Sequence, residues 1–194
     1  MSINLLETVQ KNLGYPALQK IDPNTQAVVE DIKTPDEDKF SQAAIPAILT
    51  AFYKYVQADD GAAAVLRGDY STDWVKEIFE DNKREVVQTI ASYSKLSGVE
   101  PIERMNDIAD ETIRVTKENL PADADIKDVK TFFSDQKNNI LLYLPAALHI
   151  GDLLHDDTLD DNTNKMEGPI SSLMHSIGSA FSKPVTEEEL KANK

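Results

Sequence analysis

The sequence contains one stretch, residues 140–154, that is so continuously apolar that no solvated face can be drawn on it. A helix that is hydrophobic all round lies inside a protein, so we expect this stretch to form the core helix of the fold. Pro145 falls within it, where it lacks a backbone donor and where its ring would clash with the carbonyl of Leu141. The sequence therefore predicts a buried helix that is kinked at Pro145.

A similar arrangement occurs earlier in the chain. In residues 43–52, AAIPAILTAF, Pro46 stands among small and aliphatic residues much as Pro145 does in the later stretch. This segment predicts a second proline-kinked, buried core helix. The likeness of the two phrases raises the hypothesis of a distant internal duplication, with halves of about residues 1–70 and 71–155.

Apolar residues recur at helical spacing through most of the chain, and the alternating pattern of strands is absent. The expected helices cover residues 3–13, 22–32, 36–57, 62–66, 74–79, 83–96, 100–120 and 126–133, the third of them ended by Asp59, Asp60 and Gly61. The sequence therefore predicts an all-α, compact multi-helix domain over residues 1–167. Residues 168–194 are expected to form an amphipathic helix followed by a frayed, charged tail.

Composition excludes several functions. The chain of 194 residues has no cysteine, which excludes disulfides, thiol nucleophiles and cysteine-ligated metal sites. Its formal net charge of -14 argues against nucleic acid and against anionic membrane surfaces, because binding to either needs a basic face. No stretch has the length of a transmembrane helix, and the first residues lack the features of a signal peptide. We therefore expect no membrane span and a cytoplasmic location.

The densest group of candidate metal ligands follows the apolar stretch. It consists of His149, Asp152, His155, Asp156, Asp157, Asp160, Asp161 and Glu167. Carboxylates are the ligands that Ca²⁺ and Mg²⁺ prefer, and histidine binds transition metals. We predict no cofactor for this protein, and the alternative is Ca²⁺ or Mg²⁺ bound at this cluster.

Three kinds of metal site fit parts of the cluster. The phrase LLHDDTLDD resembles the first aspartate-rich, magnesium-binding motif of polyprenyl diphosphate synthases, but no arginine and no second such motif follow it. Alternating positions from Asp156 to Glu167 match a calcium-binding EF-hand loop, except that Asp161 stands where the loop needs glycine. His149, Asp152 and Asp156 repeat at helical spacing and could share one face. The remaining interpretation is a solvated acidic loop at the end of a buried helix.

The C-terminal segment carries an apolar stripe at helical spacing. It consists of Ile170, Leu173, Met174, Ile177 and Phe181. An apolar helix face needs a partner, so we expect it to pack either on the body of this protein or against a protein partner or a second copy of the chain.

The chain resembles the YidB-like group of bacterial proteins, a family of unknown function. The resemblance rests on NLLETVQKNLG, on AAIPAIL followed by GAAAVL, and on FFSDQKNNILLYLPAALHIGDLL. It implies an all-α bacterial fold with no established activity and no catalytic residues to transfer.

No serine lies in a glycine-framed elbow and no glycine-rich phosphate loop is present, so we predict no catalytic residues. The expected function is a non-enzymatic binding or scaffolding domain. The alternative is a divalent-metal-binding protein, or a metal-dependent enzyme, that uses the acidic cluster from His149 to Asp161.

Overall fold

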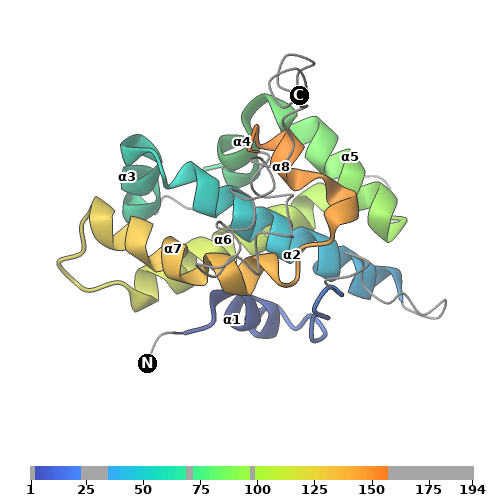
Figure 1. Ribbon diagram of the computed structural model, residues 1–194, viewed down its shortest axis with the longest axis horizontal. Helices are drawn as coiled ribbons and strands as arrows, with labels where there is room; N and C mark the ends of the chain where they lie inside the picture. Colours follow the sequence, from blue (N-terminus) through green and yellow to red (C-terminus); the bar gives the residue numbers. More distant parts are fainter. Residues whose placement is uncertain (1–2, 23–34, 69–71, 97–98, 157–194) are drawn as a thin grey trace, which may run out of the picture. The chain divides into compact units, whose positions relative to one another are not determined.

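The computed structural model describes residues 3–22, 35–68, 72–96 and 99–156 (Figure 1). Its helices are α1 (Leu5–Asn12), α2 (Asp36–Tyr55), α3 (Asp59–Arg67), α4 (Trp74–Phe79), α5 (Lys83–Ser94), α6 (Glu100–Asn119), α7 (Ile126–Leu141) and α8 (Ile150–Leu153), with single 3₁₀ turns η1 (Glu80–Asn82) and η2 (Ala146–Leu148). These residues contain no strand. The predicted all-α fold is therefore confirmed. The helix expected over residues 22–32 and the C-terminal segment 168–194 lie outside the described residues.

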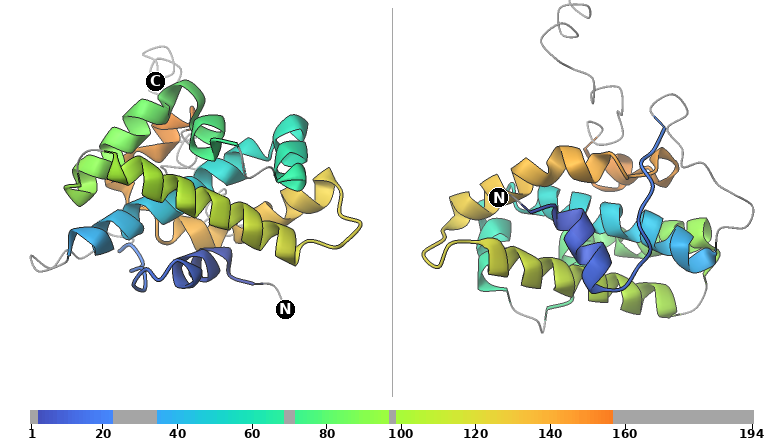
Figure 2. Two further views of the ribbon diagram at one scale, coloured as in Figure 1. Left: turned by 180° about the vertical axis from the view of Figure 1, so that it is seen from behind. Right: turned by 90° about the horizontal axis from the view of Figure 1, so that it is seen from below.

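Helix α2 is the centre of the described fold. It packs against α1, α4, α5, α6 and α7, and in the right-hand view of Figure 2 it lies between α7 (orange) and α6 (yellow-green). Every residue from 41 to 52 is buried. Because residues 43–52 are small or apolar, neighbouring helices can cover this helix on all sides. Pro46 lies inside α2, as the sequence predicts.

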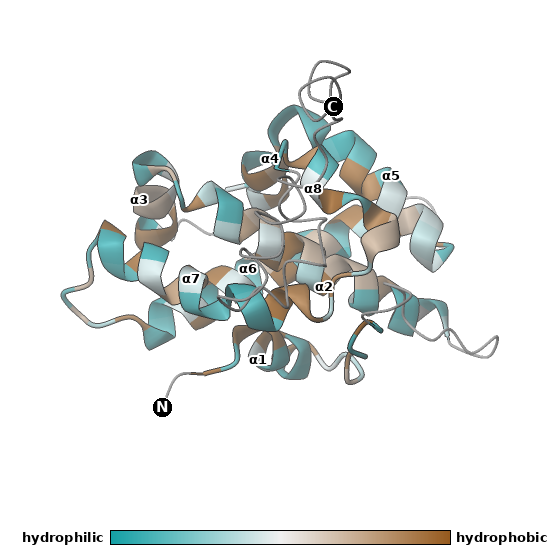
Figure 3. Cartoon of the chain, in the orientation of Figure 1, coloured by the Kyte–Doolittle hydropathy of each residue, from teal (hydrophilic) through white to brown (hydrophobic). Residues whose placement is uncertain are grey.

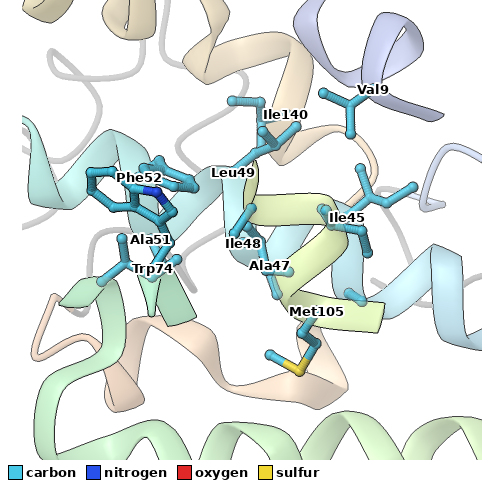
Figure 4. Packing of buried hydrophobic residues seen from close by; sticks show 14 of the residues in the cluster. Val9, Ile45, Ala47, Ile48, Leu49, Ala51, Phe52, Trp74, Met105 and Ile140 are labelled. Atoms are coloured by element: carbon cyan, nitrogen blue, oxygen red, sulfur yellow. The ribbon is translucent and has the colours of Figure 1, made fainter. Parts of the chain in front are cut away.

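The side chains of α2 reach into several parts of the core (Figure 4). Phe52 packs against Trp74 and Phe133, with ring centroids 5.9 and 6.0 Å apart. Ile48 and Met105 are fully buried where α2 meets α6. Two of the polar side chains in this buried run are satisfied within α2, because Ser41 donates to the carbonyl of Asp38 and Thr50 donates to that of Pro46.

Residues 140–154 do not form the single kinked core helix that the sequence predicts. Helix α7 ends at Leu141, and Pro145 lies outside any helix with φ −66° and ψ 127°. A proline disfavours the helical conformation of the residue before it, so the chain continues in turns. Leu144, Leu148 and Ile150 are nevertheless buried. Residues 140–154 therefore contribute to the core. The central position that we expected for this stretch is occupied by α2.

Two buried glutamines hold the chain on either side of α1. Gln42 of α2 bonds the backbone N–H and carbonyl of Gln19 at 2.7 and 3.0 Å, and also donates to the carbonyl of Tyr143. Gln136 of α7 accepts from the N–H of Leu5 at 3.0 Å and donates to the carbonyl of Ile3 at 3.1 Å. The start of the chain is therefore tied to α2 and α7.

The outer helices are amphipathic, as Figure 3 shows by the change from brown to teal across them. Helix α6 buries Met105, Ile108 and Ile113 and exposes a charged face. Among the described helices, none combines the length and the apolar composition that a bilayer crossing requires. The hypothesis of an internal duplication and the domain boundary at residue 167 stay predictions.

Candidate functional site

A cleft of about 490 Å³ lies at the C-terminal end of α2, and we call it the α2-end cleft. Its walls come from α2, α3, α4, η1 and the residues around α8. They consist of Lys54, Tyr55, Ala58, Asp60, Gly61, Ile78, Phe79, Glu80, Asp81, Asn82, Leu153, Leu154 and His155. Three of these residues, Asp60, Glu80 and Asp81, are acidic, and Lys54 is the one lysine among them.

Gly61 brings α3 against the end of α2. A Cβ placed at this position would lie 2.1 Å from the carbonyl oxygen of Tyr55, a distance that non-bonded atoms do not tolerate. Only glycine permits so close an approach of two backbones. The sequence interpretation of Asp59, Asp60 and Gly61 as the end of the preceding helix is therefore corrected, because these residues form the first turn of α3.

Two wall residues have backbone conformations that L-amino acids rarely adopt. Glu80 has φ 48° with ψ −124°, and His155 has φ 54°. Such conformations cost on the order of 1–3 kcal/mol each and persist where the surrounding structure enforces them. Here Asn82 donates to the carbonyl of Leu153 at 2.7 Å, and its Nδ2 lies 3.4 Å from Nε2 of His155. These contacts fasten the end of α8 to η1.

Lys54 closes the other side of the cleft. Its Nζ lies 3.1 Å from Oδ2 of Asp156, which ties the residues after α8 to α2. The lysine is 41% exposed, so the pair is partly screened by solvent and contributes little to stability. Its structural effect is to compensate the charge of Lys54 inside the cleft.

A second hollow of about 400 Å³ shares two wall residues, Tyr55 and Asp60, with the α2-end cleft. We call it the Trp74 hollow. Its other walls are Ala64, Arg67, Thr72, Trp74 and Glu77. The two hollows therefore meet at Tyr55, with Glu80 and Asp81 on one side of it and Glu77 on the other.

The acidic groups around Tyr55 are not neutralised by ion pairs within the described part of the chain. Their neighbours Asp59 and Asp73 are each paired with a lysine at 2.6 Å. No such pair involves the four acids of the two hollows, which are Asp60, Glu77, Glu80 and Asp81. Lys54 and Arg67 also line the hollows, but Lys54 is paired with Asp156, so the four acids outnumber the remaining wall cation and the site can attract a further cation.

Burial and the neighbouring charges both act on the phenol of Tyr55. Burial raises the pKa of Tyr55 above its ordinary value, and the negative charge of Glu77 raises it further. Arg67 opposes this shift, whereas Glu80 and Asp60 add to it. Because like charges disfavour ionisation, the phenol stays protonated at neutral pH and can donate a hydrogen bond.

A third hollow of about 610 Å³ lies between α5 and η2. Glu85 is its only charged wall residue, and the others are polar or apolar. It therefore lacks the concentration of charge that distinguishes the two hollows at Tyr55.

The predicted metal ligands are only partly described. Asp157, Asp160, Asp161 and Glu167 lie outside the described residues, as do Ile170, Leu173, Met174, Ile177 and Phe181 of the predicted partner-binding stripe. Nδ1 of His149 lies 3.6 Å from Oδ2 of Asp152, and both side chains are exposed.

The other two described members of the predicted cluster point to different partners. His155 lies beside Asn82, and Asp156 pairs with Lys54. Between residues 3 and 156, as far as they are described, no three His, Asp or Glu side chains converge as metal ligands require. The structure instead draws attention to Asp60, Glu77, Glu80 and Asp81, which sequence reasoning did not select.

Fold and site together define an all-α domain with an acidic cleft at the end of its central helix. In comparisons with protein-family models, with curated proteins and with solved structures, no match to this chain was found.

Proposed function

We propose that this protein is a non-enzymatic helical domain that binds a protein partner through the acidic walls of the α2-end cleft and the Trp74 hollow. One observation carries the proposal: four carboxylates from three elements line two adjoining hollows without a described cationic partner. The elements that hold them are fixed by the contact of Gly61 with Tyr55 and by the bonds of Asn82. A preformed acidic surface of this kind favours a basic partner.

The described surface offers little else for recognition. Val99, at 70% exposure, is the only exposed large hydrophobic residue within the described ranges. A partner that binds this part of the molecule therefore gains more from charge than from apolar burial. The formal net charge of -14 also steers basic proteins towards the molecule and repels nucleic acid.

The test compares affinity capture by three forms of the full chain. One is the wild type, the second is the cleft variant Asp60→Asn/Glu80→Gln/Asp81→Asn, and the third is the control Asp123→Asn/Glu103→Gln/Asp135→Asn. The control changes the net charge equally at exposed positions away from the cleft. We expect the wild type and the control to retain partner proteins that the cleft variant does not retain. This retention should weaken as the salt concentration rises from about 50 to about 500 mM.

Equal capture by the cleft variant and the control would show that the cleft is not the binding surface. Loss of capture by both variants would mean that net charge alone is responsible. Thermal melts of all three forms check that the substitutions leave the fold intact.

The alternative function, divalent-metal binding or metal-dependent catalysis by the cluster from His149 to Asp161, has a separate test. His149 and Asp152 are two exposed ligand side chains close enough to share one ion. Calorimetric titration of the full chain with calcium, magnesium and zinc measures this directly. Tight binding that disappears in Asp156→Asn and Asp160→Asn would favour the metal-binding function, whereas no heat with any of the three ions rejects it.

A further inference from the structure

The chain after α1 crosses the body of the protein without forming a helix or a strand. In residues 15–22, which we call the strap, Tyr15, Leu18 and Ile21 pack on the core, whereas the residues between them are exposed. In the right-hand view of Figure 2 the strap is the blue segment that runs from α1 across α2 to the end of α7. Burial at every third residue matches the period of a polyproline II helix, which has no internal hydrogen bonds and leaves its main chain free to bind a neighbour.

A buried glutamine binds the main chain of the strap. Gln42 of α2 is 6% exposed, and its side-chain amide accepts from the N–H of Gln19 at 2.7 Å and donates to the carbonyl of the same residue at 3.0 Å. The N–H of Ile21 donates to the carbonyl of Leu142 at 3.0 Å. These three bonds use only main-chain groups of the strap, so another extended chain can make them as well.

The strap is held less firmly than α1. The buried apolar residues of α1 are at most 1% exposed, whereas Ile21, at 7%, is the only strap residue in the buried core. Segments with few buried apolar contacts open before the rest of a fold does. When the strap opens, Gln42 loses both bonds to Gln19, and buried polar groups without partners destabilise a protein. The opened groove therefore favours a second extended main chain.

We infer that the surface under the strap is a binding groove for an extended segment of a partner protein, which takes the place of the strap and carries apolar side chains at every third position. The strap shows the chemistry that fits: main-chain N–H and C=O groups for Gln42 and Leu142, and aromatic or aliphatic side chains on the core. The groove lies on the first half of α2, whereas the α2-end cleft begins at Lys54, so this inference goes beyond the proposed function.

Three blocked peptides serve as probes. The strap peptide has the sequence of residues 13–22. The pattern peptide carries serine at the exposed positions 17, 19 and 20 and keeps the apolar ones, whereas the stripped peptide carries serine at positions 15, 18 and 21. Each is titrated into the full-length protein in a calorimeter. Because the strap belongs to the same chain, it competes at an effective concentration on the order of millimolar.

The strap variant Leu18→Ala/Ile21→Ala reduces this competition, because it removes apolar contacts of the strap and leaves the groove unchanged. We expect the strap and pattern peptides to bind this variant about tenfold more tightly than they bind the wild type. The stripped peptide should bind neither protein. Thermal melts check that the variant is folded.

A matched pair of substitutions in the strap variant tests the role of the glutamine. Gln42→Leu keeps the buried volume but removes the amide, and we expect it to weaken binding of the strap peptide about tenfold, since two hydrogen bonds are lost. The control Gln88→Leu, at an exposed position on α5, should leave binding unchanged. An ester in place of the peptide's amide at position 19 removes one donor and should weaken binding about two- to tenfold.

Hydrogen exchange of the wild type tests the opening of the strap without any substitution. The amides of Gln19 and Ile21 should exchange about tenfold or more faster than that of Ile48 in the buried part of α2. The inference is overturned if these amides exchange together with Ile48, or if the strap variant binds the strap peptide no more tightly than the wild type does. It is also overturned if the pattern peptide does not bind, or if Gln42→Leu and Gln88→Leu bind the strap peptide alike.

Discussion

Replacement of Gly61 by alanine tests how the end of α2 is built. The new Cβ would lie 2.1 Å from the carbonyl oxygen of Tyr55, whereas ordinary contact begins at 3.4 Å, so α3 and α2 must separate by about 1.3 Å at this point (3.4 minus 2.1). The atoms that must move are backbone, and no change of rotamer can relieve the clash. Ala62 and Val65, which follow on α3, are fully buried and would shift with it.

Two effects of opposite sign contribute to the change in stability. Alanine is favoured over glycine inside a helix by about 1 kcal/mol. Forcing an extra carbon into a packed site costs about 1–3 kcal/mol, and more when backbone has to move. We therefore expect Gly61→Ala to lower the free energy of unfolding by about 1–2 kcal/mol. The sign of the change decides between the two effects.

Urea unfolding followed by circular dichroism measures this change. Ala63→Gly on the same helix is the reference for propensity alone, and it should destabilise by about 1 kcal/mol. Fluorescence of Trp74 should also respond in Gly61→Ala, since α3 lines the same hollow. If Gly61→Ala were more stable than the wild type, the close approach of α3 to Tyr55 would be refuted, and with it our description of the cleft wall.

Three further predictions concern the core and the charge of the molecule. Leu148→Ala should destabilise by about 2–5 kcal/mol in denaturant melts, because Leu148 is 1% exposed; a change below about 1 kcal/mol would show that this region is not core. Gln136→Leu leaves the N–H of Leu5 without its buried acceptor and should cost about 1–3 kcal/mol, with faster hydrogen exchange confined to α1 at first; uniform exchange would contradict the local role of this glutamine. The hydrogen bond from Arg114 lowers the pKa of Glu111, so this carboxylate stabilises the fold above its unfolded pKa of about 4.3 and the contribution is lost as the pH falls through the lowered folded value. Glu111→Gln should therefore be less stable than the wild type at neutral pH and should lose less stability on acidification, and parallel pH profiles of the two would exclude this contribution.

The helices could be predicted because their apolar residues recur with a helical period. Helix α2 begins at the expected residue and contains Pro46, and α6 ends within a residue of its expected end. The prediction for residues 140–154 was wrong in form because uniform apolarity does not distinguish a helix from buried turns. Pro145 decided the outcome, since the chain turns away from the α7 axis before it.

The candidate site was less accessible to sequence reasoning. Glu77 and Glu80 are three residues apart, but Asp60 comes from α3, and it meets them only because Gly61 brings the start of α3 against the end of α2. Trp74 looked like an ordinary core residue, and its burial at 2% exposure agrees with that. Only the atomic arrangement shows that Nε1 has no acceptor. The one local signal was the run Asp59, Asp60 and Gly61, which begins α3 but which the sequence analysis interpreted as the end of the preceding helix.

The two glutamine ties at the start of the chain have a consequence for the order in which the protein folds. Gln136 bonds residues that precede it by 131 and 133 positions, and the carbonyl of Tyr143 reaches Gln42 across 101 positions. Contacts so far apart in the sequence form late, because a long loop must close before they give any stability. During synthesis, α2 therefore leaves the ribosome long before α7 can cover it. Until α7 and the residues up to about 143 have emerged, α2 can be covered only by α1, α4, α5 and α6, and the apolar surface that α7 will bury is open to aggregation.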